Sequence, residues 1–294
     1  MRRILLFLAT NVAVLVLLTV VCYVFGIDRS AAVQGIGGLG PLLAYAAVFG
    51  FGGAFISLAL SKSIAKWTTG AQVIAQPRDA DERWLFDAVR QHAQRAGLRM
   101  PEIAIYDGPE MNAFATGMSR NHALVAVSTG LLRGMDRDEV DAVLGHEITH
   151  IANGDMVTMT LLQGVLNTFV IFLARVVGRI VDGAIGGNSR GGGLGYFAVV
   201  MILQIVFGLI ASLIVMAFSR AREFRADAGG AKLAGRDRMI AALQRLQAQH
   251  GESTLPKAMA AFGISDKTAR GLQRLWMSHP PLEERIARLR SLPA

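Results

Sequence analysis

The stretch Ala142-Val-Leu-Gly-His-Glu-Ile-Thr-His-Ile151 decides how the rest of the chain is interpreted. It contains His146 and His150, which lie four residues apart, so on a helix both imidazoles share one face and can bind one metal ion. Glu147 lies beside them, where its carboxylate can accept a proton from water on that ion. The pattern H-E-x-x-H is typical of zinc peptidases. It also occurs by chance on ordinary helices with solvated side chains, so the surrounding sequence has to support it.

The composition indicates a membrane protein. Of the 294 residues, 52% are hydrophobic, and the mean hydropathy is +0.41. The apolar residues are concentrated in blocks, as membrane spans require. The net charge of +8 is consistent with Lys and Arg held on the cytoplasmic side of a membrane, and the sequence has no nucleic-acid-binding motif. The single cysteine, Cys22, excludes an internal disulfide and a cysteine-based metal cluster.

Two apolar runs in the N-terminal part predict a transmembrane hairpin over residues 1–60. The first run, residues 4–25, carries no charge and follows two arginines, and the second run covers residues 41–60. A signal peptide is the alternative for the first run, but the run is longer than a usual signal core and no A-x-A cleavage site follows it. The lysines that follow the second run, beginning with Lys62, predict that both ends of the hairpin are cytoplasmic.

A second apolar hairpin is predicted over residues 157–218, from runs at residues 157–174 and 194–218. Arginines near the connecting loop, including Arg175, weaken the positive-inside argument, so a shallow re-entrant pair is the alternative to two full spans. The glycine-rich loop lacks the Gly-Lys-Ser/Thr of a phosphate-binding loop and is interpreted as a connector.

The remaining segments, residues 61–156 and 219–294, are predicted to form the N-terminal and C-terminal parts of one cytoplasmic metalloprotease domain. Alternating apolar residues predict short strands at residues 102–106, 113–117 and 123–128. A capping box of Asp136 and Glu139 predicts the start of the helix that carries the motif. Helical periodicity predicts further helices at residues 81–96, 236–249, 267–276 and 282–292. The predicted fold class is α+β and mainly helical, an integral membrane protein with four apolar helices and a zincin-like cytoplasmic domain containing a small β-sheet.

A catalytic zinc site usually needs a third protein ligand. A third histidine six residues after the second is excluded because Met156 occupies that position. Between His150 and Glu223 the sequence contains neither Glu nor His. Asp155 is expected to be too near on the same helix, and Asp182 is expected across the membrane. Glu223 is therefore the first credible third ligand.

The predicted second hairpin would bring Glu223 to the two histidines, because the outer ends of its helices emerge on the same face of the membrane. Asp227 lies one helical turn after Glu223 and could orient a ligand histidine. The alternative for both carboxylates is ordinary pairing with the arginines of their own segment. The incomplete H-E-x-x-H site favours the role at a metal.

The motifs together resemble the HtpX-type membrane metalloproteases, which are relatives of the CAAX prenyl proteases. The resemblance covers nearly the whole chain and rests on His146-Glu-Ile-Thr-His150, Glu223-Phe-Arg-Ala-Asp227, Asn112-Ala-Phe-Ala115 and Ser278-His-Pro280. It implies a multi-pass endopeptidase of the bacterial cytoplasmic (inner) membrane, with one Zn²⁺ per subunit and the active site facing the cytoplasm. The implied substrates are misfolded or damaged membrane proteins, cleaved in quality control.

The resemblance also implies roles outside the metal ligands. It places Asn112, Ala113, Phe114 and Ala115 on an edge strand beside the active site, where a peptide substrate can pair as an additional strand. It makes His279 a hydrogen-bond donor to the transition state or a competing metal ligand, whereas the residues alone indicate a surface histidine before a turn. The histidines outside these motifs are predicted to be solvated: His92, His122 and His250.

Another class of protein remains an alternative, a membrane scaffold or metal-binding regulator that keeps the fold without turning over substrate. A transporter is disfavoured because no charge lies in the middle of a predicted span. The predicted partners are polypeptide substrates and the lipid bilayer, without nucleic acid. The sequence gives no indication of the oligomeric state.

Overall fold

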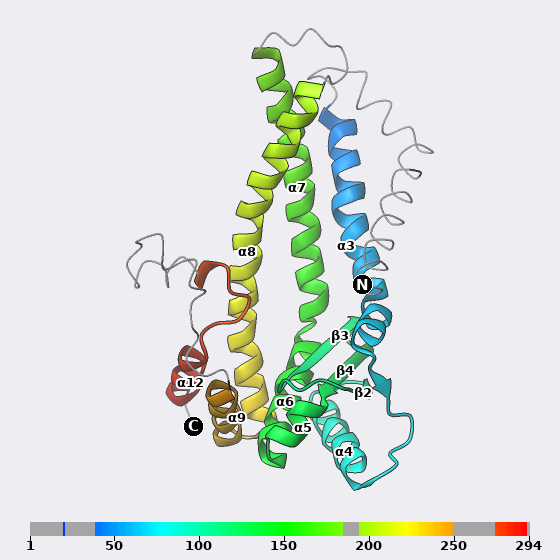
Figure 1. Cartoon of the computed structure of the whole chain (residues 1–294), viewed down its shortest axis with the longest axis vertical. Coiled ribbons are helices and arrows are strands. Elements are labelled where there is room, and N and C mark those ends of the chain that lie inside the picture. Colours follow the sequence, from blue (N-terminus) through cyan, green and yellow to red (C-terminus); the bar gives the residue numbers. More distant parts are fainter. Residues whose placement is uncertain (1–19, 21–38, 185–193, 250–273, 293–294) are drawn as a thin grey trace. The chain divides into compact units, whose positions relative to one another are not determined.

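The structure is a computed structural model, which describes residue 20 and residues 39–184, 194–249 and 274–292 (Figure 1). Two compact units divide the chain. One lies within residues 1–59 and 158–215, and the other lies within residues 60–157 and 216–294. The assignment of these parts to the bilayer and the cytoplasm stays a prediction. Three predicted features fall outside the described residues, either entirely or for the most part: the first apolar span at 4–25, His250, and the helix at 267–276.

Long apolar helices dominate the first unit. The described helices that enter it are α3 (Leu39–Thr69), α7 (Asp155–Ala184) and α8 (Leu194–Ala234), the three longest ribbons in Figure 1. Each is long and apolar enough to cross a membrane by length and composition, for which about 20 apolar residues are needed. Whether the second predicted hairpin crosses the bilayer fully or forms a re-entrant pair stays a prediction with both alternatives open. The predicted fourth apolar helix is not among the described ones.

The helix α7 extends ten residues beyond the predicted end of its apolar run at residue 174. The prediction stopped at Arg175 because a charge is costly inside a membrane. In the structure the guanidinium of Arg175 lies 4.8 Å from the ring centroid of Tyr45 on α3, and one of its nitrogens lies 3.4 Å from the tyrosine oxygen. This cation–π contact favours a charged side chain at this position of the helix.

A small mixed sheet forms one part of the second unit. Its strand order is β1 (Gln72–Val73), β2 (Glu102–Tyr106), β4 (His122–Ser128) and β3 (Ala113–Ser119). The central pair β2 and β4 is parallel, and the two outer pairs are antiparallel. In β4 every residue after the first is buried, as expected for a central strand covered on both faces. The outer strand β3 is therefore an edge of the sheet.

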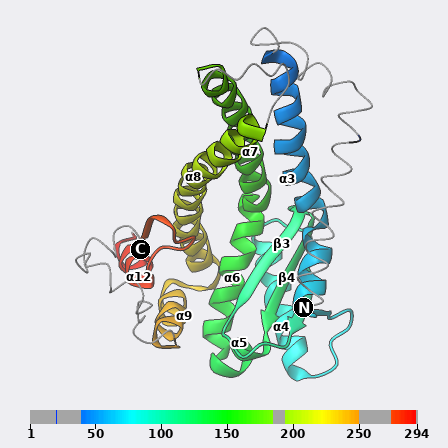
Figure 2. The same ribbon diagram turned by 45° about the horizontal axis from the view of Figure 1, so that its top comes forward.

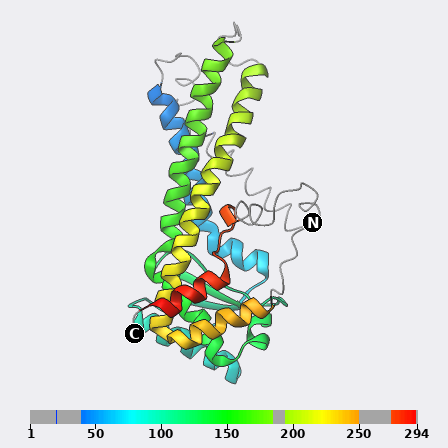
Figure 3. The same cartoon turned by 90° about the vertical axis from the view of Figure 1, so that its left-hand side faces the viewer.

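The helix α6 (Arg137–Asn153) is the centre of the second unit. It begins with the predicted capping box, in which the side chains of Asp136 and Glu139 bond each other's backbone nitrogens. It packs against β3, β4, α4 (Ala80–Arg95) and α9 (Arg236–Gln249). Figure 2 shows β3 and β4 alongside α6, and Figure 3 shows α9 beside α12 (Leu282–Ser291). Contacts on several sides bury nearly all of α6 after its first turn.

The prediction that His92 is solvated is wrong. Its side chain is 0% exposed, and Nε2 lies 2.7 Å from a carboxylate oxygen of Asp141 on α6. Residue 92 follows the helical spacing of Leu85 and Val89, so it lies on the face of α4 that packs against α6. A buried polar group is tolerated when it has a hydrogen-bond partner, and Asp141 supplies one. His122, in contrast, is exposed as predicted.

Replacing His92 with alanine should destabilise the protein, because it leaves a cavity and removes the buried partner of Asp141. We expect the free energy of unfolding to fall by about 2–4 kcal/mol. Thermal unfolding in detergent followed by circular dichroism measures the change. His122→Ala is the matched control, since it removes an exposed histidine. Equal melting temperatures for the two variants would contradict the structural role of His92.

Candidate active site

The two motif histidines and Glu147 lie in the second half of α6, where all three are at most 9% exposed. The imidazoles of His146 and His150 are perpendicular, with centroids 4.7 Å apart, and their Nε2 atoms lie 3.1 Å apart. Residues four apart on a helix are neighbours on one face. The sequence spacing therefore brings two nitrogen ligands to one point.

Glu223 reaches the same point from α8. Its side chain is 1% exposed, and its carboxylate oxygens lie 3.6 Å from Nε2 of His146 and 3.4 Å from Nε2 of His150. The three potential ligand atoms lie within 4.8 Å of one another. The structure thus brings together the three residues that the sequence predicts as metal ligands.

The donor set and its spacing fit a metal ion. The two Nε2 atoms lie 3.1 Å apart, and the carboxylate of Glu223 faces them with both oxygens, Oε2 at 3.6 Å from His146 and Oε1 at 3.4 Å from His150; ligand atoms on one tetrahedral zinc lie about 3.3 Å apart. In addition, Oε1 of Glu223 is buried and accepts no hydrogen bond from the described residues. A buried carboxylate oxygen whose nearest histidine nitrogen lies 3.4 Å away and that accepts no hydrogen bond is costly, and a cation between the three side chains would compensate it.

In each of the two histidines, the second ring nitrogen, Nδ1, lies close to a carboxylate. Nδ1 of His150 lies 2.6 Å from Asp155, which is 2% exposed. Nδ1 of His146 lies 3.0 Å from Asp227. A carboxylate at Nδ1 favours the proton there and leaves the lone pair of Nε2 for a metal. Asp227 thus lies next to a histidine of the motif, and its role there stays a prediction.

Asp155 is a functional candidate that the sequence analysis missed. The sequence analysis considered it only as a metal ligand and set it aside as too near on the helix of the histidines. In the structure Gly154 adopts the left-handed conformation with φ 67° and ends α6, so Asp155 begins α7. The turn directs the carboxylate back to His150. The pair Gly154-Asp155 directly after the motif is the signal, because glycine is the residue that most often ends a helix in this conformation.

Arg285 on α12 was also missed. It is 7% exposed, and its Nε donates a hydrogen bond of 2.8 Å to Asp227, with a second nitrogen bonding the other oxygen. This two-point contact fixes the carboxylate that faces His146. The signal in the sequence is its spacing from Ile286 and Leu289, which places an arginine on the apolar face of a helix. Such a residue requires a buried partner.

His279 also lies at Glu223, although its side chain is 62% exposed. Its Nδ1 is 2.7 Å from Oε2 of Glu223. The prediction from the residues alone, a surface histidine, fits the exposure but not this contact. Glu223 therefore faces histidines from two directions, the motif helix and the segment before α12.

A cavity of about 140 Å³ adjoins these side chains. Asn112 and Ala113 line it together with His146, Glu147 and residues of α9, as do Glu223, His279 and Arg285. The beginning of the edge strand β3 thus forms one wall. Phe114 and Ala115 follow in β3 but do not line the cavity; the ring of Phe114 lies 5.8 Å from that of Tyr106.

Glycines permit the close approach of α8 to α6 at this site. A Cβ on Gly229 would lie 2.2 Å from Cγ2 of Thr149, and a Cβ on Gly230 would lie 3.0 Å from the backbone nitrogen of His146. On the facing helix, a Cβ on Gly145 would lie 3.3 Å from the carbonyl oxygen of Gly230. Small residues at a helix crossing let backbones approach. The approach carries Glu223, less than two turns earlier on α8, to the histidines.

The surrounding carboxylates change the histidine pKa values. Burial would lower the pKa of His150, but Asp155 and Glu223 raise it to about 9. Burial likewise opposes protonation of His146, but Asp227 and Glu223 raise its pKa above the ordinary value. Without a metal, both imidazoles therefore hold a proton more tightly than a free histidine. A cation at this point would have to displace these protons.

Comparisons with known proteins identify similar chains. The sequence model of peptidase family M48 matches residues 79–292 of this chain. The chain is 63% identical over 291 residues to "Protease HtpX" of Xanthomonas euvesicatoria pv. vesicatoria, covering 99% of this chain and 97% of that protein. The same values hold for "Protease HtpX" of Xanthomonas oryzae pv. oryzae. Among solved structures, S. mikatae Ste24p matches with a TM-score of 0.68 and 20% identity, over 97% of this chain and 64% of that one, which shows a similar fold.

Gly229→Ala should separate α6 from α8 and move Glu223 away from the histidines, because the added Cβ overlaps Thr149. We expect a loss of bound metal, measured by atomic emission on purified protein, and a partial recovery in Gly229→Ala/Thr149→Ala, which removes the overlapping atoms. Gly208→Ala is the matched control on the same helix, since nothing lies within 4 Å of its Cβ position. Full metal content in Gly229→Ala would contradict the packing argument.

Removing the metal should make stability depend on pH through His150. Its folded-state pKa of about 9 exceeds the unfolded value of about 6.5. The stabilisation is thus fully present below the unfolded value and is lost as pH rises through the folded value. We expect the free energy of unfolding of chelator-treated protein to fall by about 3 kcal/mol across this interval.

Denaturant unfolding at several pH values, with and without chelator, measures this effect. Asp155→Asn should weaken the dependence, because the neutral amide no longer stabilises the protonated ring. A chelator-treated protein whose stability is constant or rises over the same pH range would refute the linkage.

Proposed function

The chain belongs to peptidase family M48, and from this premise we propose that it is a zinc-dependent endopeptidase in which His146, His150 and Glu223 hold the metal and Glu147 is the general base. The family makes it a protease of the metallo type. The resemblance to HtpX-type proteases predicted from the sequence is confirmed by the relatives. The choice of zinc and the residue roles are the content of the proposal.

The convergence of His146, His150 and Glu223 is the single observation that carries the proposal. Two imidazoles and one carboxylate are a usual ligand set for catalytic zinc, with a position left open for water. Bound there, zinc would supply Lewis acidity and make water a nucleophile at neutral pH. The carboxylates of Asp155 and Asp227 would keep both rings oriented and raise their basicity.

Glu147 performs the proton transfers in this proposal. Its side chain is 9% exposed and lines the cavity beside His146. Its carboxylate takes a proton from the attacking water and later delivers it to the leaving amine. The neighbouring His279, at the same cavity, donates a hydrogen bond to the oxyanion. Arg285 acts on the site indirectly, by holding Asp227 against His146.

The substrate is bound along β3 in this proposal. The strand pairs with β4 on one side only among the described strands, and its first residue, Ala113, follows Asn112 at the cavity wall. An extended peptide can add to such an edge through backbone hydrogen bonds, which accept many side chains. Recognition of this kind suits an endopeptidase that cleaves unfolded chains rather than one sequence.

The natural substrates in this proposal are misfolded or damaged membrane proteins, cleaved on the cytoplasmic side of the bacterial inner membrane. The apolar helices α3, α7 and α8 support membrane residence. In addition, α8 carries Glu223 within the same continuous helix as its apolar run. The basic residues that follow that run support a cytoplasmic location for the C-terminal segment.

Glu147→Gln should keep the metal and lose proteolysis, because the amide cannot accept the proton of water. We expect cleavage of casein or of a model membrane substrate by detergent-purified protein to fall by about 10²–10⁴-fold. Metal content, measured in parallel, should equal that of the wild type. Wild-type cleavage by Glu147→Gln would refute the role of Glu147.

The companion variant Glu223→Ala distinguishes the ligand from the base, since it should lose both metal and activity. Chelator should abolish wild-type cleavage, and added Zn²⁺ should restore it. If chelator has no effect and no substrate is cleaved, the scaffold alternative replaces the enzyme.

A further inference from the structure

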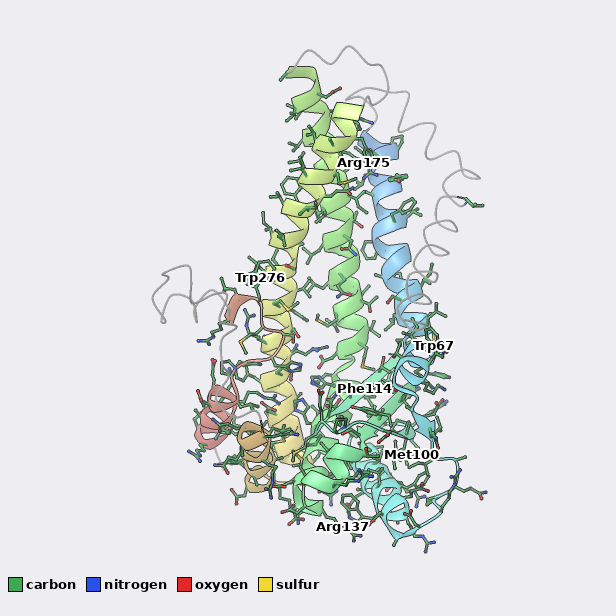
Figure 4. All side chains as sticks on the ribbon, in the orientation of Figure 1. Trp67, Met100, Phe114, Arg137, Arg175 and Trp276 are labelled. Carbon is green, nitrogen blue, oxygen red and sulfur yellow. The ribbon has the colours of Figure 1, made fainter. Side chains whose placement is uncertain are left out.

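Three consecutive large apolar side chains are exposed in the segment just before α12. Leu275, Trp276 and Met277 are 43%, 47% and 38% exposed, and Trp276 is labelled on this segment in Figure 4. Runs of exposed apolar residues of this kind are uncommon on a surface that faces water. Neither the metal site nor the proposed peptide edge uses them.

The segment is held in place by α8. One guanidinium nitrogen of Arg220 donates hydrogen bonds to the carbonyl oxygens of Leu275 and Met277, at 3.1 and 2.9 Å. The backbone nitrogen of Met277 closes a turn onto Arg274 at 3.3 Å. The exposed side chains therefore project from a backbone that is fixed to α8 rather than from a free loop.

Arg220 lies where α8 changes from apolar to basic residues. The apolar run of the sequence ends at Phe218, two residues earlier, and a basic segment with Arg222 and Arg225 follows. Where a membrane-spanning helix changes from apolar to basic residues, it passes from the hydrocarbon to the lipid headgroups. Since two residues rise about 3 Å along a helix, the exposed segment is tied to α8 at this transition.

The composition of the segment fits the same environment. Tryptophan is enriched at membrane–water interfaces because its ring is largely apolar and its N–H remains polar. Arg225 on α8 is exposed and lies 5.9 Å from the ring centroid of Phe218, so it can bind an anionic headgroup through its charge while its stem lies along apolar surface. Both features favour a lipid surface over water or a folded protein as the partner.

We propose that Leu275–Met277 is an interfacial anchor that inserts into the headgroup region of a bilayer containing anionic phospholipid, with Trp276 as its principal contact. The anchor acts on the segment that carries His279, which follows Met277 by two residues and contacts Glu223. A lipid contact thereby fixes the position from which His279 reaches the site. The membrane contact itself does not depend on whether the protein is a protease.

The test uses Trp276 as its own probe. Trp67→Phe/Trp84→Phe leaves Trp276 as the only tryptophan of the three in the chain. The full-length variant is reconstituted into vesicles of phosphatidylcholine and phosphatidylglycerol, with bromine atoms placed on the acyl chain either near the headgroup or near the methyl end. We expect the shallow bromines to quench most of the Trp276 emission, the deep bromines less, and aqueous acrylamide little.

Two matched variants control this experiment. Trp67→Phe/Trp276→Phe leaves Trp84, which lines a charged hollow with Asp87 and Arg137; it should respond to acrylamide and not to brominated lipid. Adding Arg220→Gln to the Trp276-only protein should weaken the lipid quenching, because the two carbonyl bonds are lost. Adding Arg133→Gln, which removes an exposed arginine on α5 (Thr129–Gly134), should leave it unchanged.

Quenching of Trp276 by acrylamide without any effect of brominated lipid would show that the segment faces water, and the proposal would be wrong. Protection of Trp276 from both quenchers would show that protein covers it, from a second copy or from another segment, and would also overturn the proposal. Neither result bears on the metal content of Glu223→Ala, so failure here is separable from failure of the proposed enzyme.

Discussion

The burial of one carboxylate, that of Glu223, is the constraint on which the second unit depends. A carboxylate that is 1% exposed is stable only when opposite charges or donors surround it. Here they come from α6, through His146 and His150, and from the segment that carries His279. To reach these histidines, Glu223 requires α8 to lie close to α6, and glycines at the crossing permit this approach. Asp227, which lies beside His146, is likewise buried, and Arg285 neutralises its charge. The site and the packing of the unit are therefore one network.

Much of this unit could be predicted from the sequence, because its signals are local. Helical spacing placed His146 and His150 on one face, a capping box located the start of α6, and alternation located the three longer strands. Glu223 followed from elimination, since no other Glu or His was available between the motif and that position. The set of candidate metal ligands was thus predictable before any coordinates, although the roles of these residues stay a proposal.

The features that the sequence did not predict all depend on tertiary partners. His92 is buried because Asp141 lies opposite it on another helix, and Arg285 is buried because Asp227 reaches it across 58 residues. Asp155 was misjudged because one left-handed glycine changed the direction of the chain. The helix α7 continues past the predicted apolar run, where Arg175 lies over the ring of Tyr45 on α3. In each case the position of a polar side chain depends on a contact with another segment, and residue spacing within one segment does not reveal such a contact.

The separation of the ligands along the chain has a consequence for synthesis. His150 is made 73 residues before Glu223 (223 minus 150), and His146 four residues earlier still; the intervening residues include α7 and the apolar part of α8. A nascent chain that has only reached this hairpin holds two of the three proposed metal ligands, and Asp227 still lacks Arg285. For the proposed metal site, the order of translation therefore delays a complete ligand set until α7 and the apolar part of α8 have been made.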